Sequence, residues 1–397
     1  MPMRSGGRNA SKGSSKKYSD KPLTSPIDYP FFILIITLLA IGILMMFSAS
    51  YAKAISEGYD GTFYAKKQIA LASAGVVLML IIAHIDYHIL RQPFIVFGLF
   101  IASTVLMLMC RIGPFQNPRG EIHRWITIGP LNSFQPSELM KLAIIVLFAY
   151  LISINYSRLK EFKYGIMPFL LCLGFVVALM MWQPHLSGTV IICAIGVVMM
   201  FVGGSNVKHL LILGIIGIAG VAAVVFVIMS KFGFAYFEDR LIPWIDPFNE
   251  NAPAEVWQTQ NSLIAIGSGG LFGLGFGNSR QKFLYLPEAK NDFVFAILCE
   301  ELGFFGAIVV IILFLLFTMR GFFIAARARD KFGMMLAVGL TFQIGLQALL
   351  NIAVVTNTIP NTGISLPFFS YGGTAIVLQL AQMGVVLSVS RYCTVKE

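Results

Sequence analysis

The chain has 397 residues, of which 57% are hydrophobic and only 12% are charged, and its formal net charge is +10. A mean hydropathy of +0.79 and apolar runs of about 17–28 residues exclude a soluble globular protein and indicate membrane-spanning helices. A transmembrane barrel is excluded too, because barrels are built from short segments of alternating polarity. The five cysteines form no CxxC pair, so they predict neither a disulfide framework nor a metal site.

Residues 1–27 are rich in Gly, Ser, Lys and Arg, which predicts a disordered basic cytoplasmic tail. This segment is too long and polar for a simple secretory signal. A basic cytoplasmic flank explains its charge, so nucleic acid is not an expected partner. Residues 28–392 are expected to form one membrane domain, followed by a short cytoplasmic tail at 393–397.

We predict an all-α polytopic membrane protein with ten transmembrane helices. The predicted spans are residues 31–49, 69–85, 93–110, 139–154, 166–182, 187–203, 209–230, 292–319, 334–355 and 371–390. An even number of spans places both termini on one side, and the excess of Lys and Arg in the segments on that side makes it the cytoplasm. The long loops 111–138 and 231–291 are then extracellular, the second lying between spans 7 and 8.

The predicted topology places more Lys and Arg residues on the outer side of the membrane than the positive-inside rule leads us to expect. Ordinary solvation explains Lys53, Lys66 and Lys67. Within dense polar motifs, cations that line a cleft would instead attract an anionic ligand. The residues with this second interpretation are Arg124, Lys141, Arg280 and Lys282.

The motif "HRWITIGPLNSFQPSELMK" predicts a helix that begins at Pro136, since proline is favoured at the first helical position. Glu138 and Lys141 then share one helix face, either as an ion pair that fixes the start of the span or as ligand contacts. Arg124 and Trp125 suit either a sugar or diphosphate headgroup or an anchor at the membrane interface.

Six glycines lie between residues 267 and 277, ahead of "NSRQK". Their spacing matches no nucleotide-binding fingerprint. They indicate a tight turn or a close approach of two backbones. Alternatively, this backbone together with Arg280 and Lys282 could cradle phosphates.

In "YLPEAKNDFVFAILCEELGF" a helix is expected to begin at Pro287, which would place Glu288 and Asp292 on one face. Asp292 is either a cap near the helix N-terminus or a general base at the mouth of an outward-facing pocket. Glu300 and Glu301 are expected to pair with polar groups of neighbouring helices. The loop 356–375 is predicted to form another wall of this pocket, with Ser370 offering a hydroxyl.

The motifs "FQPSELMKL", "GLGFGNSRQKFLYLPEAKNDFVFAILCEELGF" and "LPFFSYGGTA" resemble the SEDS family of bacterial cell-wall proteins, which includes FtsW, RodA and SpoVE. The resemblance extends from about Asp28 to Tyr392 and is nearer to the FtsW/SpoVE branch than to RodA. It implies a ten-span peptidoglycan glycosyltransferase that polymerises lipid II in cell division or cell-wall growth. It also implies partnership with a class B penicillin-binding protein, within a divisome or an elongasome.

By this resemblance, the essential loop aspartate of the family falls on Asp292, which favours the general-base interpretation. The arginine–tryptophan element of the family falls on Arg124 and Trp125, and its glutamate–lysine element falls on Glu138 and Lys141. The chain departs from the family at His185, which stands where an acidic residue is usual. It also departs at Lys290 and Asn291, directly before the aspartate.

The expected reaction is an inverting transfer at the outer face of the bacterial cell membrane, with undecaprenyl diphosphate as the leaving group. A divalent cation, Mg²⁺ or Mn²⁺, could help to stabilise the diphosphate, although the sequence shows no clear set of ligands. Two alternatives are a lipid II flippase and a non-catalytic scaffold for the penicillin-binding protein.

Overall fold

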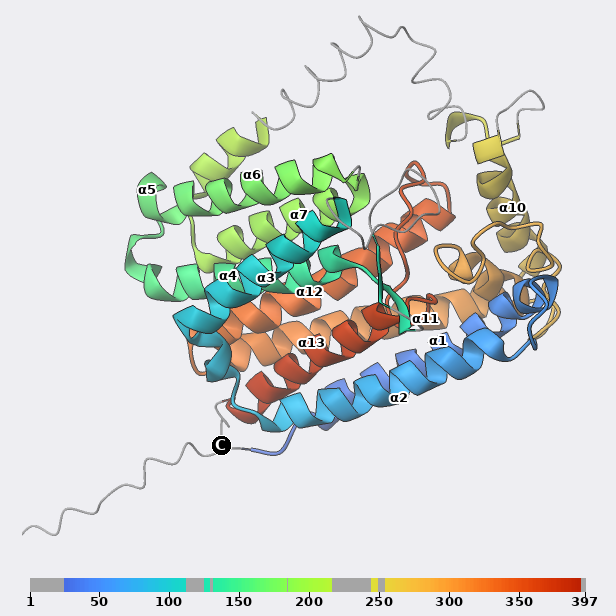
Figure 1. Cartoon of the computed structure of the whole chain (residues 1–397), viewed down its shortest axis with the longest axis horizontal. Helices are drawn as coiled ribbons and strands as arrows, with labels where there is room; N and C mark the ends of the chain where they lie inside the picture. Colours follow the sequence, from blue (N-terminus) through green and yellow to red (C-terminus); the bar gives the residue numbers. More distant parts are fainter. Residues whose placement is uncertain are drawn as a thin grey trace, which may run out of the picture.

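The computed structural model describes residues 25–111, 125–128, 131–183, 185–215, 244–248 and 254–393. Within these ranges nine helices are long and apolar enough to cross a membrane, and they lie side by side in one bundle (Figure 1). This confirms the predicted helical membrane fold. The spanning helices are α1 (Tyr29–Ser56), α2 (Phe63–His84), α3 (Pro93–Arg111), α4 (Pro136–Ile154), α5 with α6 (Phe162–Gly165 and Met167–Trp182), α7 (Leu186–Gly203), α11 (Val294–Arg327), α12 (Lys331–Val355) and α13 (Thr374–Arg391).

The remaining elements are short or lie at the ends of the bundle. Residues 207–215 are helical, but most of the predicted span 209–230 lies outside the described residues, as do the tails 1–24 and 394–397. One local exception to the all-α prediction is a two-stranded antiparallel hairpin just before α4. The other elements are η1 (Tyr87–Arg91), β1 (Ile126–Ile128), β2 (Leu131–Phe134), η2 (Tyr156–Arg158) and α10 (Ala254–Gly269).

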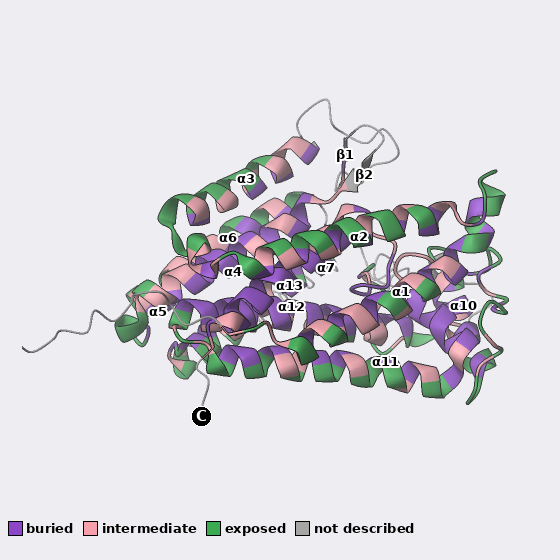
Figure 2. Ribbon diagram, turned by 90° about the horizontal axis from the view of Figure 1, so that it is seen from below, coloured by how far each residue is buried: buried purple, intermediate pink, exposed green. Residues whose placement is uncertain are grey.

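The centre of the bundle is formed by α4, α12 and α13, whose residues are mostly buried, whereas α2 and α11 expose one face (Figure 2). Helices α2 and α13 pack closely because glycines face the opposite helix. A Cβ atom at Gly75 would lie 2.7 Å from a methyl group of Leu380, and one at Gly384 would lie 2.6 Å from the Met79 carbonyl oxygen. Membrane helices associate closely where small residues allow their backbones to approach.

Helix α11 is broken at Gly303, whose φ of 68° and ψ of −167° are non-helical. The part before the break, Val294–Glu301, is buried, whereas the part after it exposes large apolar side chains such as Phe304 and Phe305. The break also brings Gly303 against the loop that follows α10, where a Cβ would lie 2.3 Å from the Gly273 nitrogen. Only glycine fits this combination of positive φ and close backbone contact.

Candidate functional site

The loop that carries Asp292 does not start a helix at Pro287 as expected. Residues 287–293 form turns, and α11 begins at Val294. The physical reason is the backbone of Glu288, whose φ of 54° lies in the left-handed region and interrupts an α-helix. Glu288 is exposed, and its carboxylate accepts a hydrogen bond from the Asn291 side chain.

The backbone of Asp292 is fixed, whereas its carboxylate is left available. Asn351 on α12 donates to the Asp292 carbonyl oxygen at 2.7 Å and to the Ile364 carbonyl oxygen at 2.6 Å, which joins the two outer loops. The N-cap of α11 is Phe293, with no side-chain capping bond. Among the described residues, no hydrogen bond to the Asp292 carboxylate is formed. The geometry therefore gives no support to the capping interpretation.

Burial, and secondarily the negative charge of Glu288, raises the pKa of Asp292 to about 6. The carboxylate is enclosed by protein atoms although a part of the residue remains accessible from the surface. It is therefore mainly ionised at neutral pH and yet a much stronger base than an exposed aspartate. A carboxylate with this combination can accept a proton from a bound hydroxyl group.

A small polar cavity of ≈ 40 Å³ lies beside Asp292. Gly363 forms part of its wall, and a Cβ at Gly363 would lie 3.4 Å from the Asp292 Oδ2 atom. The predicted pair Glu138 and Lys141 lines the cavity from α4. The full lining is Gln135, Ser137, Glu138, Lys141, His185, Ser187, Gly188, Ile191, Gln347, Gly363, Ile364 and Ser365.

Glu138 and Lys141 form a buried ion pair of 2.8 Å, which is one of the two interpretations left open by the helix spacing, and α4 begins at Pro136 as expected. Lys141 also donates to the Gln347 side-chain oxygen at 3.1 Å. Within the described part of the chain, Glu138 Oε2 and the Ser137 hydroxyl are buried without hydrogen-bond partners. Buried polar atoms are rarely left unsatisfied, so these atoms are suited to contacts with a polar ligand.

His185 belongs to the same cavity. It precedes α7 as the N-cap residue, where its Nδ1 accepts from the Gly188 N–H at 3.4 Å. Its Nε2 lies 2.9 Å from the Gln135 side-chain amide. His185 is therefore part of this wall and contacts both the first turn of α7 and Gln135.

Lys290 is a residue of this site that the sequence prediction missed. Its ammonium nitrogen lies 3.4 Å from the centre of the Tyr64 ring and 5.5 Å from that of Tyr371. Its carbonyl oxygen accepts the Tyr371 N–H at 2.8 Å, and the Tyr64 hydroxyl donates to Glu57. Burial lowers the pKa of Lys290, while Glu57 and Glu288 act in the opposite direction. Lys290 thus connects the Asp292 loop to the α1–α2 turn and to the loop before α13.

Lys282 does not offer its charge to a ligand. It is buried, and its ammonium group donates to Glu301 at 3.0 Å, to the Ser48 hydroxyl at 3.0 Å and to the Gly277 carbonyl oxygen. All three ammonium hydrogens are used, so the predicted role of Lys282 in substrate binding is not supported by this geometry. The expectation that Glu301 pairs with polar groups of neighbouring helices is confirmed by Ser48 on α1, whereas Lys282 belongs to the loop before α11.

Glu300 and the glycine-rich loop also have structural contacts. The Glu300 carboxylate accepts from the Ser279 hydroxyl and from the Arg280 N–H at 2.9 Å. In the loop, the N–H groups of residues 273, 274 and 275 donate to the carbonyl oxygens of residues 269, 300 and 301. These donors are occupied, so the loop provides a close backbone approach and these groups do not cradle a phosphate.

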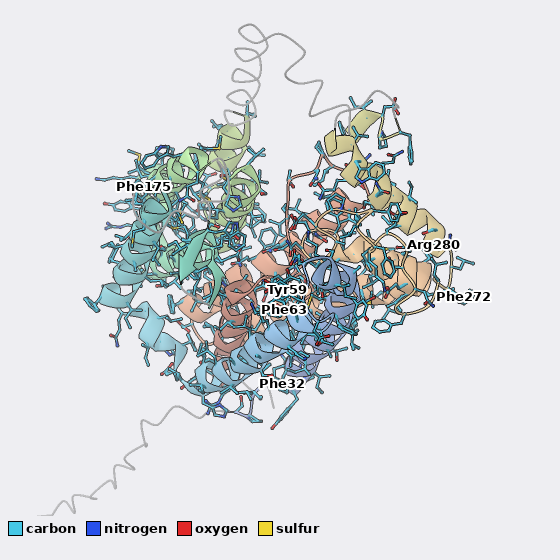
Figure 3. All side chains as sticks on the ribbon, turned by 45° about the vertical axis from the view of Figure 1, so that its right-hand side comes forward. Phe32, Tyr59, Phe63, Phe175, Phe272 and Arg280 are labelled. Atoms are coloured by element: carbon cyan, nitrogen blue, oxygen red, sulfur yellow. The ribbon has the colours of Figure 1, made fainter. Side chains whose placement is uncertain are left out.

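The other predicted contacts are dispersed. Arg280 is exposed at the rim of the molecule, away from Tyr59 and Phe63 (Figure 3). Ser370 is buried, and its hydroxyl accepts the Leu366 N–H at 2.7 Å, so it shapes the loop. Trp125 is half-buried next to β1, and Arg124 lies outside the described residues.

A metal site is not evident from the side chains. The described residues contain no group of three or more His, Cys, Asp or Glu that could hold a metal ion. Glu288 is the carboxylate whose charge acts on Asp292, and Glu138 lines the adjoining cavity. A divalent cation thus remains a prediction, and no catalytic step below depends on it.

Comparison with known proteins gives a consistent result. A family model for FtsW, RodA and SpoVE, described as "cell cycle protein", matches residues 29–395. Stage V sporulation protein E of Bacillus subtilis is 40% identical over 372 residues, covering 93% of this chain and 98% of that protein. A probable peptidoglycan glycosyltransferase FtsW of a Geobacter species is 35% identical over 363 residues, covering 91% and 96% of the two chains.

Solved structures agree at the level of the fold. A chain from a peptidoglycan synthase complex that coordinates polymerisation and crosslinking superposes with a TM-score of 0.74 at 25% identity, covering 92% of this chain and 98% of that chain. The rod shape determining protein RodA of Thermus thermophilus gives a TM-score of 0.65 at 25% identity, covering 92% and 97%. With a family model that matches almost the entire described chain, the protein belongs to the FtsW/RodA/SpoVE family, as its motifs predicted.

Proposed function

We propose that this protein is a peptidoglycan glycosyltransferase that polymerises lipid II. The observation that carries the proposal is the Asp292 carboxylate, which burial makes more basic, beside a polar cavity. The names of the FtsW relatives and the polymerising complex support the same activity.

In the proposed reaction, Asp292 removes the proton from the 4-hydroxyl of the acceptor sugar. The resulting oxygen nucleophile attacks the anomeric carbon of the donor, and the bond to undecaprenyl diphosphate breaks with inversion. A general base of this kind contributes about 10²–10⁴-fold to the rate. Diphosphate is a good leaving group, so the reaction needs no carboxylic acid to protonate it.

Cationic groups near the cavity would stabilise the departing diphosphate. Lys141 is the best placed of the predicted cations, because its contacts to Glu138 and Gln347 use two of its three ammonium hydrogens in the described part of the chain. Lys290 holds the base in position from the other side. Arg280 lies at the rim and would contribute only to attraction of an anionic substrate over a longer distance.

The orientation in the membrane is part of the proposal. Asp292, Pro136 and Thr374 lie at or near the starts of α11, α4 and α13, so the site is at one end of the bundle. The opposite end carries Arg320, Arg327 and Arg391, which the positive-inside rule assigns to the cytoplasm. Both termini would then be cytoplasmic, and the site would face outward, where a class B penicillin-binding protein could crosslink the product.

The test is polymerisation of labelled lipid II by the purified protein in complex with its candidate transpeptidase. Wild type is compared with Asp292→Asn and with Asp60→Asn, a matched change at an exposed aspartate of the α1–α2 turn. We expect glycan chains from wild type and Asp60→Asn and none from Asp292→Asn. Equal chains from all three would refute the assignment of the base. No chains from any of them, in an intact complex, would favour the flippase.

A further inference from the structure

Helix α12 reaches the site with two amide side chains, those of Gln347 and Asn351. They are four residues apart and therefore share one face of the helix. Both are buried where α12 packs against α4, α11 and α13, and Asn351 is completely inaccessible to solvent. Burial of an amide costs free energy unless its groups form hydrogen bonds, so the partners of these two side chains indicate what they do.

Both amides hold the same segment of the cavity wall. Asn351 Nδ2 donates to the Ile364 carbonyl oxygen at 2.6 Å. Gln347 Nε2 donates to the Ser365 carbonyl oxygen at 3.1 Å and to the Ser365 hydroxyl at 3.2 Å. Ile364 and Ser365 line the polar cavity beside the base. Side-chain hydrogen bonds from α12 therefore fix this wall, which lies in a loop without regular secondary structure.

The same two amides also contact the groups that take part in the proposed reaction. Asn351 Nδ2 donates at 2.7 Å to the carbonyl oxygen of Asp292, the residue that supplies the base. Gln347 Oε1 accepts from the Lys141 ammonium group at 3.1 Å. Helix α12 thus connects the base, the wall that faces it and the cation proposed to stabilise the diphosphate, although these groups come from three separate parts of the chain.

The hydrogen-bonding balance of Asn351 indicates that packing alone does not account for an asparagine here. Its Oδ1 atom is buried without a partner in the described part of the chain, which costs free energy that an apolar side chain of similar size would avoid. What the amide adds is a pair of donated bonds that join two loops. The Asp292 loop needs such a link, because residues 287–293 form turns and α11 begins only at Val294.

We propose that Asn351 is a positioning residue for the glycosyl transfer, which holds the backbone of Asp292 at a fixed place relative to the cavity wall. This inference rests on the proposed function, since Asn351 acts on the reaction only through the base. Its donors are directed at backbone carbonyl oxygens and not at reacting atoms. A displacement of a catalytic group by about 1 Å can lower the rate about a hundredfold, so a link of this kind has a measurable effect.

The test compares Asn351→Leu with Gln343→Leu in the purified full-length protein, in complex with its candidate transpeptidase. Gln343 is a matched control, because it is also completely buried on α12, two turns earlier, and donates to the Gln382 side-chain oxygen at 3.2 Å, outside the cavity lining. We expect Asn351→Leu to lower kcat for labelled lipid II about ten- to a hundredfold with little change in KM. Gln343→Leu should keep kcat close to that of wild type.

The pH–rate profile is a readout that general destabilisation would not change. Burial raises the pKa of Asp292 to about 6, and a loop released from α12 admits water to the carboxylate. The acidic limb of the profile should therefore move to lower pH in Asn351→Leu. The charged and titratable groups around the base, Glu288 in its own loop and Glu138, Lys141 and His185 across the cavity, are the same in both proteins.

A second variant covers the case in which leucine prevents folding. Asn351→Ser is smaller and keeps one donor, so it should be folded, as shown by its thermal unfolding midpoint, and have a kcat between those of wild type and Asn351→Leu. An unchanged kcat in both Asn351 variants would overturn the positioning role and leave the proposed function intact. Equal losses in Asn351→Leu and Gln343→Leu without a shift of the acidic limb would overturn it in favour of packing. No glycan chains from wild type in an intact complex would refute the proposed function, and this inference with it.

Discussion

Asp292→Asn should abolish polymerisation and yet make the protein more stable at neutral and alkaline pH. Burial and Glu288 raise the pKa of Asp292 from 3.8 to about 6. Since each tenfold change in proton affinity is worth about 1.4 kcal/mol, the ionised carboxylate costs up to about 3 kcal/mol of unfolding free energy. Asparagine has a similar shape and carries no charge, so the variant removes this cost.

The pH dependence identifies the cause. The folded-state pKa is above the unfolded value, so the folded protein keeps a proton between pH 4 and 6 that the unfolded chain releases. The contribution of Asp292 to stability therefore falls as pH rises through this window, and its cost is complete above pH 6. We expect the gain in stability of Asp292→Asn to be about 1–3 kcal/mol at pH 8 and to vanish near pH 4.

The assay is thermal unfolding of wild type and variant in the same detergent between pH 4 and pH 8, with lipid II polymerisation measured on the same samples. Asp60→Asn is the control of opposite sign. Hydrogen bonds from Thr62 and Lys66 lower the pKa of Asp60 to about 2, so its replacement gives no gain at pH 8. An inactive Asp292→Asn that is less stable than wild type at pH 8 would show that Asp292 is structural, and would refute the argument.

Three further substitutions test the surroundings of the base. Lys282→Met should reduce stability by about 3–5 kcal/mol, because it leaves Glu301 as a buried charge without a counter-charge. The double variant Lys282→Met/Glu301→Gln should recover part of this loss in a thermal unfolding experiment. The absence of any recovery would contradict the pairing of Lys282 with Glu301. Lys290→Met should lower kcat by about two- to thirtyfold through loss of the cation–π contacts, while KM changes little. Lys290→Arg should retain most of the activity. Equal losses of kcat in both variants would contradict a positioning role of the Lys290 charge. Gly363→Ala should lower the free energy of unfolding by about 1 kcal/mol or more, because Gly363 has a φ of 65°. The added methyl group should further desolvate the Asp292 carboxylate and so move the acidic limb of the pH–rate profile to higher pH. An unchanged acidic limb would argue against the proximity of Gly363 and Asp292.

Much of the fold could be predicted because its signals are local in the sequence. Apolar length located every predicted span that the structure describes, and proline at position 136 marked the start of α4. The Glu138–Lys141 pair followed from helical spacing alone. In contrast, the prediction that a helix begins at Pro287 was wrong, because nothing in the local sequence indicates the left-handed backbone conformation of Glu288.

The contacts that organise the site come from residues far apart in the chain. Lys282 binds Ser48, which lies 234 positions earlier. Lys290 lies against Tyr64 at the start of α2 and near Tyr371 in the loop before α13. Single-sequence patterns contain no signal for such pairings. A basic residue near the outer end of the bundle was therefore predicted to contact a ligand whether it lines a cavity, as Lys141 does on α4, or pairs with an internal carboxylate, as Lys282 does.

The break at Gly303 divides α11 between two tasks. From Phe304 to Arg327 the helix rises about 36 Å at 1.5 Å per residue, which is enough to cross the hydrocarbon core of a bilayer. The preceding segment from Val294 is not needed for crossing, and it serves as the buried floor beneath the loop of the base. Substitutions before Gly303 should therefore impair turnover in protein that is correctly inserted, whereas polar substitutions after it should reduce insertion itself. The lipid-facing part of α11 after Gly303 can therefore differ with the thickness of the bilayer, while the part before Gly303 keeps its geometry.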